Sequence, residues 1–254
     1  MLSEKRRNEI VTYLEKHNTA TVQELVDALN SSAATIRRDI SALHDEHRIV
    51  KVFGGATSLS FKEINAAEPS VAEKATLNTE EKMRIAEYAA SLIRDDDFVY
   101  IDSGTTTLYM VDFIANTKAS FVTNGIAHAK RLIERGLPTI IVGGQLKPVT
   151  EAVIGAQCAD ELSKFHFTKA FMGTNGISLK AGFSTPDPEE ALVKRVAVKH
   201  SLDTYVLADY SKFDAISPVS FAELRDCVII TDSKADKKYS GEAMIEIAKE
   251  NKQK

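Results

Sequence analysis

A run of small and hydroxyl-bearing residues follows an apolar stretch near the middle of the chain. The apolar stretch Phe98–Ile101 ends in Asp102-Ser103-Gly104-Thr105-Thr106-Thr107, and a helical pattern runs from Leu108 to about Ile114. Such a turn supplies free backbone N–H groups, hydroxyl donors and the positive end of a helix dipole, which together bind phosphate. The alternative is that these residues only cap the helix.

Similar polar loops follow other predicted strands. They are Thr123-Asn124-Gly125, Gly143-Gly144 and Gly173-Thr174-Asn175-Gly176. Open α/β sheets bind ligands at the carboxyl ends of their strands, so we expect these loops to converge on one cleft.

Two further segments bring charge to this part of the chain. Thr185–Glu190 leads into a helix with Lys194 one turn beyond Glu190, and Asp209-Tyr210-Ser211-Lys212 follows a strand. For Lys194 the alternative is a surface ion pair with Glu190, worth about 0.3–0.5 kcal/mol. For Lys212 it is a solvated loop charge. Lys212, beside Ser211 and directly after a strand, is the better ligand candidate.

A second group of candidates lies on a predicted helix from Ala33 to about Glu46. Its outward face presents Ala33, Ala34, Arg37, Arg38 and Ser41. Small residues let the start of a helix approach base edges, and two arginines one turn later can fork onto guanine or phosphate. The alternative is a solvated face whose arginines pair with Asp39 or Glu9.

The elements around this helix predict a winged helix-turn-helix. A first helix spans about 3–16, and Thr21-Val22-Gln23-Glu24 is a capping box that begins a second. Asn30 suits the helix end, and Ser31 or Ser32 caps the third helix. Arg48–Phe53 and the turn Gly54-Gly55 then predict a β wing, where Arg48 and Lys51 could contact DNA.

The rest of the chain predicts an α/β domain with a largely parallel sheet, because strands and helices alternate. A helix begins near Asn78, capped with Glu81 in the Asn-x-x-Glu manner, and Gly241–Lys249 is predicted as a closing helix. The strands are Phe98–Ile101, Ser120–Val122, Thr139–Val142, Lys169–Met172, Thr204–Ala208 and Cys227–Thr231; helices include Ala127–Arg135 and Pro188–His200. We predict domains at 1–57 and 78–254, with a linker at 58–77.

Composition predicts a globular cytoplasmic protein. Of its 254 residues 44% are hydrophobic and 27% charged, with a net charge of −4. Residues 1–58 hold eight Lys/Arg and eight Asp/Glu, so any DNA contact depends on charge placement. We find no signal peptide or membrane span. Cys158 and Cys227 are predicted as buried thiols, and we expect no metal and no cofactor.

The amino-terminal motif resembles the signature of the DeoR family of bacterial repressors. It comprises Arg6, Ile10 and Leu14, then Ser32-Ala33-Ala34-Thr35-Ile36-Arg37-Arg38-Asp39-Ile40 and finally Gly54-Gly55-Ala56. The resemblance adds Thr35 to the DNA-reading residues. Two departures fall in the wing: His47-Arg48 stands where glycine is usual, and Phe53 replaces a frequent histidine.

The larger part resembles the DeoR-family sensor domain, which is similar in fold to ribose 5-phosphate isomerase. The matching residues are Asp102–Thr107, Thr123-Asn124, Gly143-Gly144, Asn175-Gly176-Ile177, Thr185–Glu190 with Lys194, and Asp209–Phe213. The resemblance implies that Ser103–Thr107 hold a phosphate with Lys212 as counter-charge. It also implies that Thr123, Asn124 and Asn175 bind sugar hydroxyls, and the full effector set includes Gly173, Gly176 and Ser211.

The segments Glu68–Lys74 and Thr185–Leu192 resemble the fructose-operon repressors most closely. This implies fructose 1-phosphate as inducer, with tagatose 6-phosphate as the nearest alternative. We therefore predict a homo-oligomeric repressor, dimer or tetramer, released from double-stranded operator DNA by a sugar phosphate. The linker and the following helix would transmit the ligand signal.

Two other functions are compatible with the sequence. One is a sugar-phosphate isomerase or deaminase with an accessory DNA-binding domain, in which Glu190 and Lys194 would be acid and base. The other is a carboxyl-terminal domain that serves only for oligomerisation.

Overall fold

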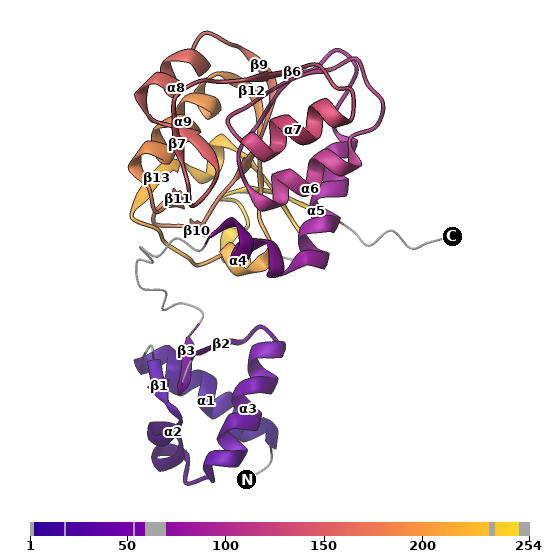
Figure 1. Ribbon diagram of the computed structural model, residues 1–254. Coiled ribbons are helices and arrows are strands. Elements are labelled where there is room, and N and C mark those ends of the chain that lie inside the picture. Colours follow the sequence, from indigo (N-terminus) through magenta and orange to yellow (C-terminus); the bar gives the residue numbers. More distant parts are fainter. Residues whose placement is uncertain (1–2, 18, 53, 59–69, 234–236, 249–254) are drawn as a thin grey trace, which may run out of the picture. The chain divides into compact units, whose positions relative to one another are not determined.

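The chain divides into two compact units, residues 1–63 and 64–254 (Figure 1). The computed structural model describes residues 3–17, 19–52, 54–58, 70–233 and 237–248. Of the predicted linker residues, 59–69 lie outside the described residues, as does Phe53.

The first unit is a three-helix domain with a small antiparallel sheet. Its elements are α1 (Ser3–His17), β1 (Thr19–Thr21), α2 (Val22–Leu29), α3 (Ala33–Asp45), β2 (Ile49–Val52) and β3 (Gly55–Ser58), with strand order β1-β3-β2. The apolar stripes of the three helices form its core, which includes Ile10, Leu14, Leu25, Ile36, Ile40 and Leu43.

The helix caps predicted for this unit are confirmed. The Thr21 amide donates to Glu24 Oε2 at 2.7 Å, and the Glu24 amide donates to Thr21 Oγ1 at 3.1 Å. Asn30 ends α2 with a left-handed φ of 46°. Of the two serines considered, Ser32 caps α3 by accepting from the Thr35 amide. Local side chains thus fix both ends of the turn between α2 and α3.

Strand β1 was not predicted from the sequence. It pairs with β3 in the register Thr21↔Gly55, which extends the wing to three strands. A Cβ at Gly55 would lie 2.1 Å from the Ala20 carbonyl oxygen, so only glycine permits this close pairing.

The second unit is built on a seven-stranded parallel sheet. Its strand order is β15-β14-β12-β9-β4-β5-β6. The strands are β4 (Phe98–Ile101), β5 (Ser120–Thr123), β6 (Thr139–Ile141), β9 (Phe167–Gly173), β12 (Ser201–Leu207), β14 (Val228–Thr231) and β15 (Met244–Ile247). All six predicted strands belong to it, which confirms the α/β class with a parallel sheet.

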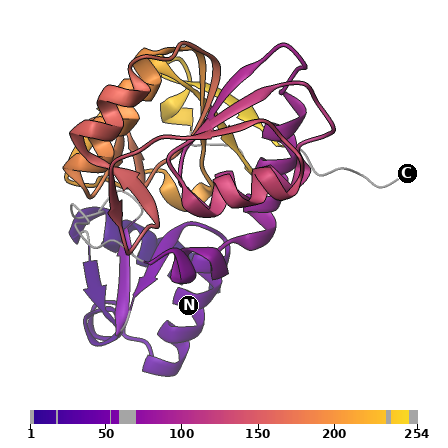
Figure 2. The same cartoon turned by 45° about the horizontal axis from the view of Figure 1, so that its top comes forward.

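Helices cover both faces of this sheet (Figures 1 and 2). One face packs against α5 (Thr79–Ser91), α6 (Thr105–Phe113) and α7 (Ile126–Glu134), the other against α8 (Gly155–Leu162) and α9 (Pro188–Lys199). Alternation along the strands produces two cores: Val99 and Ile101 face the first set of helices, whereas Tyr100 faces the second.

The direction of strand addition reverses at β4. From β4 the chain adds β5 and β6 on one side, and then β9, β12, β14 and β15 on the other. The carboxyl ends of β4 and β9 therefore flank a topological switch point, where open α/β sheets form their ligand crevice. The segments Asp102–Thr107 and Gly173–Gly176 follow these two strands.

Two small antiparallel sheets were not predicted. One pairs β7 (Gln145–Lys147) with β8 (Ala152–Ile154); the other has the order β10 (Gly176–Ser178), β11 (Gly182–Thr185), β13 (Val219–Ala222). Short 3₁₀ turns complete the unit at Tyr210–Lys212, Leu224–Asp226 and Lys237–Tyr239.

Three local predictions were wrong. Within the predicted linker, Val71–Thr76 forms helix α4, which begins with a capping box at Ser70 and Glu73. Asn78 precedes α5 but makes no side-chain cap, because its amide donates to Asp209 Oδ1 at 2.9 Å. The expected closing helix at 241–249 is instead strand β15, which pairs with the otherwise open edge of β14; Lys249 lies outside the described residues.

Candidate functional site

Arg37 and Arg38 of α3, predicted to contact DNA, have exposed side chains. Within the described part of the chain neither guanidinium has a hydrogen bond or ion pair. Of the two carboxylates considered as alternative partners, Asp39 and Glu9, Asp39 is buried and bonded to Arg6, with Nε to Oδ2 at 2.5 Å. Arg7 lies 3.6 Å from the same carboxylate. Internal pairing of Arg37 and Arg38 with Asp39 is therefore excluded.

Residues at the start of α3 are accessible, whereas Ser41, about two turns later, is bonded to the wing. Ala34 is exposed, and Ala33 and Thr35 are half-buried. Ser41 accepts a hydrogen bond from Lys51 Nζ at 2.9 Å and donates to the Arg37 carbonyl. Ser41 and Lys51 thus brace the wing against the helix.

The wing residue Arg48 also has partners inside its own unit. Its guanidinium donates to Asn8 Oδ1 at 2.7 Å and lies 3.7 Å from Glu46. His47 adopts a left-handed φ of 54°, the conformation that glycine adopts without strain, so this departure from the family pattern preserves the backbone path. DNA contact by Arg48 would require it to leave these partners.

In the second unit, the start of α6 offers unpaired donors. Thr105, Thr106 and Thr107 open the helix, and no bond from their backbone N–H groups occurs among the described residues. Ser103, Gly104 and Thr105 are partly exposed. These three N–H groups lie at the positive end of α6, where the sequence predicts an anion site.

Thr107 serves the loop itself. It is fully buried, and its hydroxyl accepts from the Gly104 amide at 2.9 Å and lies 2.6 Å from the Asp102 carbonyl oxygen. His128 Nε2 lies 3.1 Å from the same hydroxyl. Burial lowers the pKa of His128 to about 4, so the ring is neutral at physiological pH. His128, missed by sequence reasoning, packs behind the loop.

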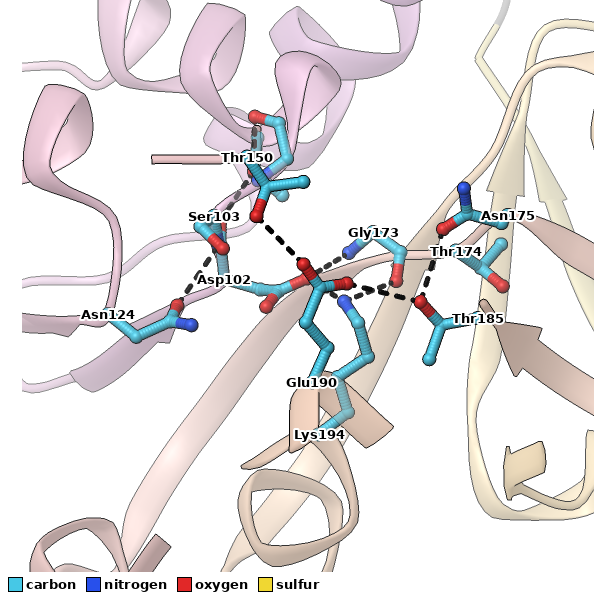
Figure 3. Close-up of polar contacts among 12 residues, drawn as sticks. Asp102, Ser103, Asn124, Thr150, Gly173, Thr174, Asn175, Thr185, Glu190 and Lys194 are labelled. Atoms are coloured by element: carbon cyan, nitrogen blue, oxygen red, sulfur yellow. Dashed lines mark hydrogen bonds and ion pairs between the residues drawn. The ribbon is translucent and has the colours of Figure 1, made fainter. Parts of the chain in front are cut away.

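A buried ion pair joins the two switch-point loops (Figure 3). Lys194 Nζ is bonded to Asp102 Oδ2 and donates to the Gly173 carbonyl at 3.1 Å. The Gly173 amide donates to the same Asp102 oxygen at 2.9 Å. The alternative considered for Lys194, a surface ion pair with Glu190, is therefore wrong, because Lys194 turns inward to Asp102.

Glu190 is the centre of a second buried network (Figure 3). Its Oε1 accepts from Thr150 Oγ1 at 2.8 Å and lies 3.3 Å from Lys147 Nζ. Thr185 Oγ1 lies 3.2 Å from Oε2 and 3.3 Å from Asn175 Oδ1. Through Thr185, this network connects Asn175 to Glu190, as expected if these loops converge. It also adds Lys147 and Thr150, which had no sequence signal because the β7–β8 hairpin was not predicted.

The side chains of Asn124 and Thr123 form hydrogen bonds to the backbone of neighbouring loops. Asn124 Oδ1 accepts from Tyr100 Oη at 3.0 Å and from the Ser103 amide at 3.1 Å, and its Nδ2 donates to the Val153 carbonyl. Thr123 is fully buried and accepts from the Gly125 amide. Both side chains thus have protein partners, and a role in binding hydroxyls stays a prediction.

The glycines of the predicted effector set contact different parts of the second unit. Gly173 lies in the Asp102 network, and the Gly176 carbonyl accepts from Thr174 Oγ1 at 2.9 Å. The Gly143 amide is bonded to Glu161 Oε2, and Gly144 approaches Cys158 of α8. Among the contacts of the described residues, none joins Gly143 or Gly144 to Asp102.

The loop after β12 forms a third polar group. Asp209 is buried, and its Oδ1 accepts from the Ser211 amide and from Asn78 Nδ2, both at 2.9 Å. Lys212 is partly exposed, and its ammonium has neither a hydrogen bond nor an ion pair among the described residues. Lys212 is therefore available as a counter-charge for an anion.

Lys82 is a further buried cation beside this loop, and we expect it to make stability depend on pH. Burial lowers its pKa from 10.5 to about 8; the Asp209 charge opposes this shift, whereas Lys212 and Lys74 add to it. The folded state then binds fewer protons than the unfolded state between pH 8 and 10.5. The penalty for the buried charge is complete below pH 8 and disappears as pH rises through that window.

Lys82→Met should remove this dependence. Between pH 7 and 10.5, we expect the unfolding free energy of the native protein to rise by about 3 kcal/mol relative to the variant. Urea denaturation followed by circular dichroism at several pH values measures the difference. Lys130→Met, at an exposed position, is the control and should run parallel to the native protein. Parallel curves for Lys82→Met would contradict the buried charge.

Comparison with known proteins agrees with both halves of this description. A DeoR-like helix-turn-helix domain model matches residues 6–62, and a DeoR C terminal sensor domain model matches residues 77–233. The chain belongs to the DeoR family. The uncharacterized HTH-type transcriptional regulator FruR of Bacillus subtilis (strain 168) is 44% identical over 91% of each chain. The lactose phosphotransferase system repressor of Staphylococcus epidermidis is 33% identical over 95% of this chain and 97% of its own.

Membership of the DeoR family confirms that the chain is a DNA-binding transcription regulator and not an enzyme. The isomerase alternative, with Glu190 and Lys194 as acid and base, is therefore wrong.

Among solved structures, ribose 5-phosphate isomerase A from Methanocaldococcus jannaschii has a TM-score of 0.41 and 13% identity, covering 54% of this chain and 55% of its own.

No described helix is both long and apolar enough to span a bilayer. No group of three or more His, Cys, Asp or Glu residues within the described ranges could hold a metal ion. Cys158 and Cys227 are free, buried thiols, as predicted.

Proposed function

We propose that this DeoR-family regulator represses a sugar-utilisation operon and leaves its operator when a phosphorylated sugar binds. The observation that carries the proposal is a set of three N–H groups at the start of α6 and the Lys212 ammonium at the same edge of the sheet, none of which has a partner among the residues that the structure describes. Free donors at a helix end favour a phosphate. A positive side chain in a neighbouring loop adds charge-assisted contact.

We assign fructose 1-phosphate as the effector, with tagatose 6-phosphate as the second candidate. The similarity to FruR supports the first, and that to the lactose phosphotransferase system repressor supports the second. We further propose a homo-oligomer that reads two half-sites, because symmetric operators match symmetric repressors.

The test is fluorescence anisotropy on DNA from upstream of the protein's own gene, titrated with fructose 1-phosphate. Salt must be constant, because phosphate contacts make affinity strongly salt-dependent. We expect tight binding that fructose 1-phosphate relieves and unphosphorylated fructose does not. Release by tagatose 6-phosphate alone would change the effector. If neither compound releases DNA, other sugar phosphates are tested next, and failure of every phosphorylated sugar to raise the melting temperature would support a domain that serves only for oligomerisation.

The paired substitution Thr106→Ala and Lys212→Ala tests the phosphate site. We expect a protein that binds DNA normally but needs at least tenfold more sugar phosphate for release, since each lost contact to a charged group costs about 1.5–3 kcal/mol. Lys180→Ala, an exposed lysine at the β10–β11 turn, is the control for charge. An unchanged response in the double variant would contradict the assignment.

A further inference from the structure

Helix α4 cannot be stable by itself. It has six residues, none of them buried, whereas isolated helices shorter than about 12–15 residues are marginal in water. The capping box at Ser70 and Glu73 helps it to begin. Its helical state therefore depends on the surface on which it rests.

Four hydrogen bonds hold α4 against its neighbours in the second unit. Thr79 Oγ1, at the start of α5, donates to the Ala75 carbonyl at 3.2 Å, and the other three come from three different elements. Tyr109 Oη of α6 donates to the Ala75 carbonyl at 3.1 Å. Lys82 Nζ of α5 donates to the Lys74 carbonyl. The Val71 amide donates to the Val149 carbonyl in the β7–β8 turn at 3.3 Å.

Each of these elements also carries part of the candidate effector site. Helix α6 begins with the unpaired N–H groups of Thr105–Thr107. The β7–β8 turn contributes Thr150, which donates to Glu190. Helix α5 follows Asn78, which donates to Asp209. A displacement of α5, α6 or the β7–β8 turn when the effector binds would therefore act on α4 through direct contacts.

Asp209 is a second acceptor near Lys82: the Lys82 amide donates to the Asn78 carbonyl at 3.0 Å, and the Asn78 side chain donates to Asp209 at 2.9 Å. Asp209 Oδ1 has three donor contacts, from Asn78 and from the amide and hydroxyl of Ser211, whereas Asp209 Oδ2 is buried and has no hydrogen-bond partner among the described residues. A buried carboxylate that loses a donor recovers the cost by attracting a nearby cation. If Ser211 turns its hydroxyl to a phosphate, Asp209 will attract Lys82 more strongly.

We propose that α4 is a releasable latch, and that effector binding moves Lys82 from the Lys74 carbonyl to Asp209 so that α4 leaves its surface. This inference rests on the proposed function. Six residues that change from helix to extended chain gain about 10 Å of reach, from about 1.5 to 3.3 Å per residue. Because α4 lies near the amino-terminal boundary of the second unit, its release adds to the length of chain that joins this unit to the DNA-reading domain and changes the spacing of two such domains.

The test is hydrogen–deuterium exchange of the full-length protein, read at the amides of Val71–Thr76. Tyr109→Phe removes one bond to α4 and keeps the ring. We expect exchange in α4 to accelerate about two- to tenfold, as expected for one hydrogen bond. The matched control is Tyr88→Phe on α5. It removes a hydroxyl that donates to Glu246 at 3.2 Å and should leave the exchange of α4 amides unchanged.

The functional arm uses operator binding by anisotropy. Tyr109→Phe combined with Lys82→Met should weaken DNA binding several-fold without any sugar phosphate. In the native protein, fructose 1-phosphate should accelerate α4 exchange over the concentration range in which it releases DNA. Unaltered α4 exchange during release, or a double variant with fast α4 exchange and normal DNA affinity, would overturn the latch. Fructose 1-phosphate that neither binds nor releases DNA would refute only the assigned effector, since the double variant tests the latch independently.

Discussion

Arg37→Ala is expected to weaken binding to DNA from upstream of the protein's own gene by about 5- to 150-fold. This range corresponds to the 1–3 kcal/mol that a bidentate contact between arginine and guanine contributes. The domain itself should be unaffected, because the Arg37 side chain is exposed and has no hydrogen-bond or ion-pair partner within the described residues. Fluorescence anisotropy at constant salt measures the loss.

The salt dependence separates the two ways in which these arginines could act. If Arg38 contacts phosphate, Arg38→Ala will weaken binding to every sequence and reduce the slope of log affinity against log salt by about one. If Arg37 reads a base, Arg37→Ala will relax sequence preference at one position. Lys180→Ala removes a surface charge from the other unit and is the control. Native-like affinity of the double variant Arg37→Ala, Arg38→Ala would refute DNA reading by α3.

Lys194→Met is expected to destabilise the sensor domain by about 3–5 kcal/mol. The substitution leaves the Asp102 carboxylate buried, with only 2% of its side chain exposed, and with the Gly173 amide as its remaining side-chain donor. An uncompensated buried charge is expensive, even though a buried ion pair as a whole contributes little net stability. Urea denaturation followed by circular dichroism measures the loss.

A double-mutant cycle separates the charge from the packing. Asp102→Asn combined with Lys194→Met removes both charges, so we expect it to be less destabilised than the sum of the single changes. Lys199→Met, at an exposed position on the same helix, is the matched control and should change stability by less than about 0.5 kcal/mol. Strict additivity of the two single changes would show that the ion pair does not join the switch-point loops energetically.

Local sequence patterns were sufficient to predict the helix caps of the first unit, the strands of the parallel sheet and the residue types of the candidate sites. The capping residues Thr21 and Ser32 fixed the helix-turn-helix because their hydrogen bonds involve neighbours three residues away. The six predicted strands were found because apolar runs buried in a parallel sheet differ from the polar loops between them. The residue types that suit phosphate and DNA were likewise readable, since they follow from local chemistry at a helix end and on one helix face.

Tertiary structure alone decided which charged groups meet. Lys194 is one turn from Glu190 in sequence, yet it pairs with Asp102, 92 positions away, because the switch point places β4 beside β9. Asn78 gives up its helix cap for Asp209, 131 positions away. Residues 244–247 form a strand rather than a helix because β14 offers an open edge. Long-range pairing overrides local preference at these positions, since burying a charge or completing a sheet edge changes the free energy more than a helix cap does.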